Sequence, residues 1–385
     1  MGAVTPALTP VPSPASPSTA RALNDRLALR LLQEDGPLTA TQLKAGTGLS
    51  RPSVADLVDR LTGAGLIEVV GESGEQRRGP NAKLYGIVAR RAHLAALDVR
   101  TDSVTAVVTD LLGRPLAEAA LPAGAPDEAV AALLRAARGA GAGALHTVVV
   151  GAPGLVAPAT GELRDTTGLP SWHRDLVAAL QRSLSAVVVV ENETNLAALA
   201  EQRLGAARDL DSFVLLWLGA GVGAAVVLEG RLRRGASGGA GEIGFLPVPG
   251  TGGLPSATDC GGGFHALAGR DAVTELARGH GFTGPVEEAV AGAADEAFLD
   301  ALAERLALGA AAVAAVLDPG CVVLAGELGH AGGPALAARV ARRLSTLTPV
   351  PTEVRATTLG SPAVLEGARL AAREAAQAQL FGGSA

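Results

Sequence analysis

A helix-turn-helix pattern between residues 38 and 66 is the feature that most restricts how this chain can fold. A first short helix would place Leu38, Leu43 and Ala45 on one face, and Gly48 can supply the tight turn that follows. Two helices joined in this way can enter the major groove of DNA. The same pattern also fits a plain helical hairpin, so it needs support from the residues around it.

The second helix of this pattern carries side chains that could read DNA. Ser50 is a natural N-cap, and Pro52 fits the first turn, where its missing N–H has no helical partner to lose. The inward positions repeat at helical spacing and are Val54, Leu57, Val58 and Leu61. The polar residues that we predict to contact DNA in this region are Thr39, Ser50, Arg51, Ser53 and Asp56.

Two short apolar segments, 66–70 and 83–87, flank a Gly-rich polar loop and predict a β-hairpin directly behind the second helix. Arg77 and Arg78 at the tip of this hairpin suit contact with phosphate or with the minor groove. For the tip alone, a solvated loop is the alternative. Together, the helix-turn-helix and this wing predict a DNA-binding domain over residues 21–90.

Charge and cysteine content exclude several other classes of protein. Residues 1–20 carry no charge and are rich in Pro, Ser, Thr and Ala, which predicts a disordered tail and not a signal peptide. Residues 21–90 hold 10 Lys/Arg against 8 Asp/Glu, whereas the rest of the chain holds 22 against 30 and is no nucleic-acid surface. The two cysteines, Cys260 and Cys321, fit a reducing compartment. Without an apolar stretch of membrane-spanning length, we expect a cytoplasmic protein with no membrane partner.

The rest of the chain, residues 91–385, repeats one strand plan. Segments 93–98 and 103–110 predict two strands around a tight turn, and 213–219 and 223–230 repeat this plan about 120 residues later. Apolar runs that alternate with Ala- and Leu-rich helical segments predict mixed α/β layers. Two such lobes would bring their turns face to face across a cleft. The predicted fold is therefore a winged helix-turn-helix followed by a two-lobed α/β sugar-kinase or actin-like ATPase fold.

Five motifs follow one another in this body: residues 150–155, 168–172, 190–199, 218–223 and 234–244. In this order they resemble the ROK family, whose name joins repressors, open reading frames and sugar kinases. The resemblance covers about residues 92–380, and the winged helix in front resembles the repressor branch of the family. At Glu193 the chain looks similar to the xylose-type repressors, which carry Glu there.

The motifs also place polar side chains where a ligand could bind. Asn192 and Glu193 end a buried strand, which is where open α/β sheets bind ligands, and an amide can both donate to and accept from a hydroxyl. The pair could instead simply cap the next helix. Glu242 lies in a glycine-rich loop. The resemblance implies that the sugar-binding residues are Pro153, Gly154, Asn192, Glu193 and Glu242.

The nucleotide loops depart from the pattern of the family's kinases. Those kinases begin with Asp-x-Gly-Gly-Thr, whereas segment 98–102 reads Asp-Val-Arg-Thr-Asp and its side chains would hinder a phosphate. In the second loop Gly219, Gly221 and Gly223 could bring backbone N–H groups to a phosphate, or could merely form a hairpin turn. Ala220 stands there in place of the usual Thr. We interpret this second loop as a vestigial nucleotide loop.

Catalytic and metal positions are altered as well. Glu193 replaces the usual base, Asp, and a misplacement near 1 Å can cost about a hundredfold in rate. Cys260 and His265 alone cannot build a structural zinc site. The resemblance also implies an acidic sugar ligand after this motif, but that position falls near Leu267. We therefore expect no catalytic residue, no metal and no cofactor in an inactive kinase-derived body.

The sequence thus predicts a sugar-responsive transcriptional repressor. It would bind operator DNA through the winged helix, sense a small-molecule sugar in the degenerate kinase cleft, and form a homodimer or a higher homo-oligomer. One alternative is an active ROK sugar kinase with a fused DNA-binding domain. Another is a DNA-binding protein whose body serves only as a dimerisation scaffold.

Overall fold

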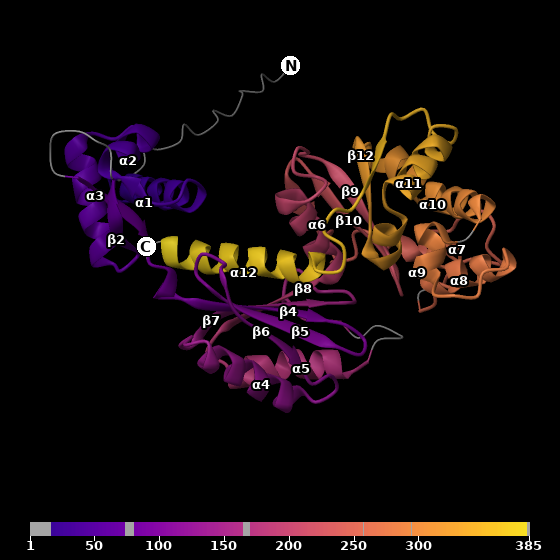
Figure 1. Ribbon diagram of the computed structural model, residues 1–385, viewed down its shortest axis with the longest axis horizontal. Helices are drawn as coiled ribbons and strands as arrows, with labels where there is room; N and C mark the ends of the chain where they lie inside the picture. The colour runs from indigo at the N-terminus through magenta and orange to yellow at the C-terminus, as the bar shows by residue number, and fades with distance from the viewer. Residues whose placement is uncertain (1–16, 74–80, 165–169, 257, 294, 383–385) are drawn as a thin grey trace, which may run out of the picture. The chain divides into compact units, whose positions relative to one another are not determined.

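The computed structural model describes residues 17–73, 81–164, 170–256, 258–293 and 295–382. They divide into two compact units (Figure 1). One unit holds the chain up to Arg91 together with the residues from Ala375 onward, and the other holds Ala92–Glu374. Residues 1–16 of the predicted tail, and Arg77 and Arg78 of the predicted wing tip, lie outside the described residues.

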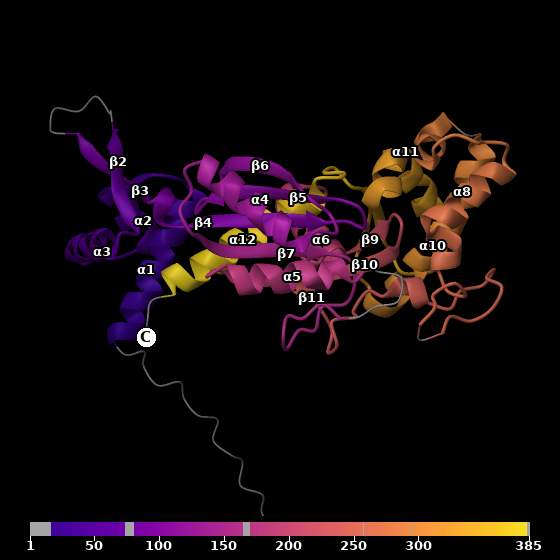
Figure 2. The same cartoon turned by 90° about the horizontal axis from the view of Figure 1, so that it is seen from below.

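The N-terminal unit is a winged helix. Its elements are α1 (Pro17–Glu34), β1 (Leu38–Thr39), α2 (Ala40–Thr47), α3 (Arg51–Gly63), β2 (Ile67–Ser73), β3 (Ala82–Ile87) and a 3₁₀ turn at Ala89–Arg91. The strands pair antiparallel in the order β1-β3-β2, and a bulge lies between Val69 and Gly71 of β2. Figure 2 shows the β2–β3 ribbon that forms the predicted wing.

Helices α2 and α3 confirm the predicted helix-turn-helix. The Ser50 hydroxyl accepts a hydrogen bond from the Ser53 N–H at the start of α3, and Gly48 has a left-handed φ of 69° after α2. All four predicted inward residues of α3 are buried. Leu43 is buried too, but Ala45 is exposed, because two residues turn an α-helix by about 200° and carry Ala45 to the opposite face.

Two helices that the sequence did not predict complete this unit. Helix α1 begins at Pro17, so the last four residues of the predicted disordered tail are helical, and proline is well suited to a first helical turn. The other helix is α12 (Ala363–Phe381), whose residues from Ala375 onward belong to this unit. There the Gln377 amide donates a hydrogen bond to the Gln33 side-chain oxygen at 2.7 Å.

The second unit contains two lobes, each built on a five-stranded sheet. The first lobe contains β4 (His93–Val99), β5 (Val104–Asp110), β6 (Pro115–Leu121), α4 (Pro126–Gly139), β7 (Leu145–Ala152), α5 (Trp172–Ser183) and β8 (Val187–Asn192). Its strand order is β6-β5-β4-β7-β8, with β4, β7 and β8 parallel to one another. Helices α4 and α5 cover one face of this sheet (Figure 1). The predicted hairpin of β4 and β5 is confirmed.

The second lobe repeats the plan with more helices. Its elements are β9 (Phe213–Leu218), β10 (Val222–Leu228), β11 (Arg231–Arg233), a 3₁₀ turn (Ile243–Phe245), α7 (His265–Ala268), α8 (Arg270–Gly279), α9 (Val286–Glu288), a π-type turn (Ala289–Ala293), α10 (Glu296–Leu317), β12 (Cys321–Ala325), α11 (Gly326–Leu344) and β13 (Glu353–Ala356). The strand order is β11-β10-β9-β12-β13. Strands β9 and β10 form the second predicted hairpin, so the two-lobed α/β prediction is confirmed.

Each lobe has its own apolar core of Val, Leu and Ala side chains, and the second adds Phe264 and Phe298. Helix α6 (Glu193–Leu204) packs against strands of both sheets. Helix α12 crosses α6 so closely that a Cβ on Gly367 would collide with the backbone carbonyl of Leu196. No helix among the described residues is both long and apolar enough to cross a membrane.

Candidate functional site

The carboxyl ends of parallel strands from both lobes meet at one place. In the first lobe β4, β7 and β8 run parallel, so their last residues lie along the same sheet edge. In the second lobe β9 and β12 run parallel, and their last paired residues are Trp217 and Ala325. Arg100 follows β4 and contacts Glu327, which follows β12, so the two edges face each other. This is where α/β sheets commonly bind ligands.

Asn192 ends β8 and caps α6. Its side-chain oxygen accepts hydrogen bonds from the N–H groups of Thr194 at 2.8 Å and Asn195 at 3.3 Å. Its amide nitrogen donates to the Gly154 carbonyl at 3.0 Å. Asn192 therefore performs the capping role that the sequence left open as an alternative, and it also fixes the loop after β7. One amide hydrogen of Asn192 is left for a ligand.

Glu191 and Arg234 form an ion pair to which the sequence analysis assigned no role. One oxygen of the buried Glu191 carboxylate, Oε2, lies 2.7 Å from the Arg234 Nε and 2.6 Å from its Nη2. The other carboxylate oxygen accepts from the Asn195 amide at 2.9 Å. Because Arg234 begins the loop that carries Glu242, the pair ties that loop to the end of β8. An acid at the end of a buried strand was the signal that could have revealed it.

Glu242 lies on a loop that packs against the residues after Gly154. A Cβ added to Gly239 would contact both Leu155 and the Glu242 side chain, and a Cβ on Gly238, whose φ is 87°, would collide with the backbone carbonyl of Val156. Gly154 and the Glu242 loop are therefore neighbours. The Glu242 residue is exposed overall, yet protein around its carboxyl raises its pKa above the ordinary value.

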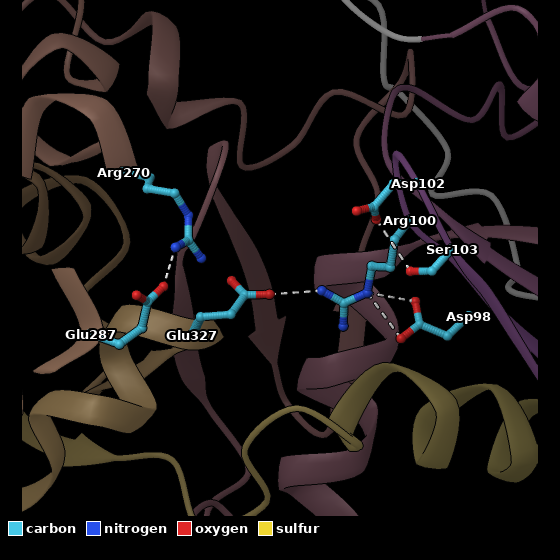
Figure 3. A network of polar contacts seen from close by, with 7 residues as sticks. All are labelled: Asp98, Arg100, Asp102, Ser103, Arg270, Glu287 and Glu327. Carbon is cyan, nitrogen blue, oxygen red and sulfur yellow. Dashed lines mark hydrogen bonds and ion pairs between the residues drawn. The ribbon is translucent and has the colours of Figure 1, made fainter. Parts of the chain in front are cut away.

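Arg100 links the two lobes through a network of charges (Figure 3). Its Nε lies 3.0 Å from both carboxylate oxygens of Asp98, and its Nη1 donates to Glu327 at 2.8 Å. The guanidinium also lies 5.7 Å from the centre of the Trp217 ring. The buried His173 donates from Nε2 to the Arg100 carbonyl at 3.1 Å and so holds the backbone in place. No sequence pattern pointed to His173 or Glu327, or to a partner for Arg100.

Glu193 begins α6 beside this network. Burial, opposed by Arg100 and reinforced by Asp98 and Glu327, raises the pKa of Glu193 to about 7. Burial also raises the pKa of Asp98. For Arg100 burial alone would lower the pKa, but the surrounding carboxylates outweigh it and raise the pKa further. The Glu193 residue is half-buried as a whole, yet the protein around its carboxyl makes the charged form unfavourable even next to an arginine.

The glycine-rich loop joins β9 to β10 as a tight hairpin turn. The Gly219 N–H donates to the Gly221 carbonyl at 3.1 Å, and neither these glycines nor Gly223 has a positive φ. A Cβ on Gly219 would collide with the Glu327 carboxylate, and one on Gly223 would reach the Thr194 hydroxyl at 3.4 Å. The missing side chains at Gly219 and Gly223 therefore leave room for groups that contact the turn.

The cysteines lie apart from any cluster of metal-binding side chains. Cys260 is half-buried, and Cys321 is buried in β12, where burial raises its pKa to about 12. Leu267 packs in the second-lobe core. Within the described ranges, no three His, Cys, Asp or Glu side chains gather in a way that could hold a metal ion.

Four of the predicted DNA contacts lie on the exposed start of α3: Ser50, Arg51, Ser53 and Asp56. The Asp56 carboxylate pairs with Arg60 one turn later, so its charge is already met within the helix. Thr39 is different, since it is buried and forms a capping box with Gln42 at the start of α2. The structure thus gives Thr39 a helix-capping role inside the protein.

A family model described as the ROK family matches residues 94–375. This chain belongs to the ROK family. A second model, of the MarR family, matches residues 23–79, the winged helix. This ROK chain is also similar to a solved structure titled a ROK family transcriptional regulator, a homolog of the Escherichia coli MLC protein. The two share 20% identity with a TM-score of 0.75 over 94% of this chain and 98% of that one, a likeness of fold.

Two curated relatives of this ROK chain are regulators, and a further solved structure that resembles it is an enzyme. The DNA-binding transcriptional dual regulator NagC of Escherichia coli is 28% identical over 59% of this chain, and the alignment spans only 57% of that relative. The xylose repressor of Bacillus subtilis is 23% identical over 59% of this chain and 60% of its own. The ROK hexokinase of Thermus thermophilus is 27% identical with a TM-score of 0.61, covering 74% of this chain and 99% of that one.

Proposed function

We propose that this ROK protein is a sugar-responsive transcriptional repressor that binds operator DNA through its winged helix. The observation that carries the proposal is the exposed, correctly capped start of α3, where Arg51 and Ser53 lie at the surface, on the same chain as a ROK body. The names of two relatives, NagC and the xylose repressor, support this assignment.

The proposed sugar site is formed by Pro153, Gly154, Asn192, Glu193 and Glu242. Its support is the linkage of three of these positions, because Asn192 holds Gly154 and the Glu242 loop packs against the residues after Gly154. Because the site draws on both lobes, a bound sugar would change how the lobes meet. We propose that this change alters operator affinity, with the protein acting in the cytoplasm as a homodimer or higher oligomer on repeated half-sites.

We propose that the two-lobed body is not an active kinase. Arg100 and Glu327 stand between the two turns where a nucleotide would place its phosphates, and Ala220 and Glu193 replace a hydroxyl and the usual base. One observation favours the alternative, an active sugar kinase with a fused DNA-binding domain. Glu193 has a pKa of about 7, a value suited to a general base that deprotonates a sugar hydroxyl.

The test combines DNA binding with turnover. DNA fragments that bind the full-length protein are selected from a random pool, and gel shifts are repeated with a panel of neutral, acetylated and phosphorylated sugars. We expect one class of sugar to release the DNA and none to produce ADP from ATP. Sugar-dependent ADP release would favour the kinase. If no sugar changes operator binding, the result would favour a body that serves only as a dimerisation scaffold.

A further inference from the structure

The carboxylate of Glu327 lies directly against the glycine-rich turn. Helix α11 begins at Gly326, immediately after β12, and this places Glu327 in its first turn. A Cβ on Gly219 would collide with the Glu327 Oε2 atom, so this oxygen fills the space that the missing side chain leaves open. An anion of the protein itself therefore occupies the room that such a turn can offer to a phosphate.

The partner of this carboxylate comes from the other lobe. Arg100 reaches from the end of β4 with Nε on Asp98 and Nη1 on Glu327, while its guanidinium faces Trp217 of β9 (Figure 3). The Arg100 and Glu327 side chains are 24% and 31% exposed, so solvent screens their attraction only in part. A planar, forked guanidinium is needed to make both contacts at once.

The surrounding charge opposes any incoming phosphate. Asp98, Glu193 and Glu327 all act on the Arg100 guanidinium, so three acidic side chains surround this one cation. A phosphate could use the Arg100 guanidinium only by displacing Glu327, and it would then still face Asp98 and Glu193. Repulsion of this kind excludes a ligand as effectively as a steric clash.

We propose that Glu327 is an internal occupant of the phosphate position, and that its ion pair with Arg100 holds the two lobes together in place of a nucleotide. The chain can then keep its lobes together around the sugar site without ATP. The pair also determines ligand specificity, because the Glu327 side chain occupies the turn and excludes the phosphates of a nucleotide. The readouts below need neither a sugar nor an operator, so this proposal can fail independently of the proposed function.

The first experiment measures ADP binding to the full-length protein by titration calorimetry, with and without Mg²⁺. We expect no binding to the wild type at up to millimolar ADP. Glu327→Ala, which removes both bulk and charge, should bind ADP roughly tenfold or more tightly than the wild type, as expected for the loss of one like charge at close range. Glu327→Gln, which keeps the bulk, should gain less. ADP binding by the wild type, or no gain in Glu327→Ala, would overturn the occupant role.

The second experiment measures the distance between the lobes. Spin labels are placed at the exposed positions Glu118 on β6 and Glu304 on α10, in a chain whose two cysteines are replaced. Arg100→Met, in the first lobe, should widen and shift the distance distribution. Glu327→Gln, which alters the partner in the second lobe, should have the same effect. Arg270→Met is the matched control, because Arg270 pairs with Glu287 inside the second lobe (Figure 3).

Circular dichroism melts establish that each labelled variant is folded. If Arg100→Met does not fold, the distance distribution of Glu327→Gln decides the test. Distributions that stay unchanged in the Arg100 and Glu327 variants would overturn the inter-lobe role. Equal broadening in the Arg270 control would overturn it too, since loss of any arginine would then have the same effect.

Discussion

The unusual state of the Glu193 carboxyl leads to a prediction about pH and stability. Its pKa is raised from 4.5 to about 7 by burial, so the folded protein holds this proton more tightly than the unfolded chain does. The associated stability is fully present below pH 4.5 and is lost as the pH rises toward 7. Glu193→Gln, which keeps the shape of the protonated acid, should remove this loss.

The size of the effect follows from the difference between the two pKa values. Each unit corresponds to about 1.4 kcal/mol, so the full effect is on the order of 3 kcal/mol, of which roughly 2–3 kcal/mol falls between pH 5 and pH 8. We therefore expect Glu193→Gln to become more stable than the wild type by this amount as the pH is raised across that range.

Urea unfolding followed by tryptophan fluorescence measures this directly, because the chain has only two tryptophans, Trp172 and Trp217, and both lie in the two-lobed body. Glu118→Gln, which removes an exposed carboxylate from the first lobe, provides the matched control. A difference in the free energy of unfolding between wild type and Glu193→Gln that stays constant from pH 5 to 8 would contradict the reasoning. If Glu193→Gln instead becomes less stable relative to the wild type as the pH rises, the attraction of Arg100 outweighs the effect of burial on the Glu193 pKa.

Three further predictions concern DNA and ligand. Replacing Arg51 and Ser53 with alanine should abolish specific operator binding while the body remains folded, and undiminished gel shifts would refute the assignment. Removing Arg77 and Arg78 should lower the salt dependence of binding by roughly one to two phosphate contacts, whereas an unchanged slope with altered sequence preference would show that the wing reads bases. Asn192→Ala should abolish the response to inducer but not operator binding, at a cost of about 1 kcal/mol for the lost N-cap. Asn192→Ser should lose the same response while keeping the cap, and a serine variant that still releases DNA with inducer would place the ligand elsewhere.

Local patterns predicted much of this fold. The helical spacing of Val54, Leu57, Val58 and Leu61, and the Ser50 cap, depend only on neighbours within a few residues, and the structure confirms them. The two hairpins that open the lobes are equally local, since each strand pairs with the next one along the chain.

Contacts between distant residues could not be predicted in this way. Arg100 and Glu327 are 227 residues apart, and Gln33 and Gln377 are 344 apart, so no local spacing connects either pair. Glu191 and Arg234 could be seen in their motifs, but nothing in the sequence says which cation meets which acid. For Thr39, the residue type fitted both a DNA contact and a helix cap, and only its burial distinguishes the two.

The central claim is that a sugar bound near Asn192 and the operator bound at α3 affect each other. The most direct measurement is calorimetric titration of the releasing sugar into the free protein and into its complex with selected DNA. Linkage requires that the sugar bind more weakly to the complex by the same factor by which it weakens DNA binding, typically about five- to 150-fold. Identical sugar affinity with and without DNA would contradict the account.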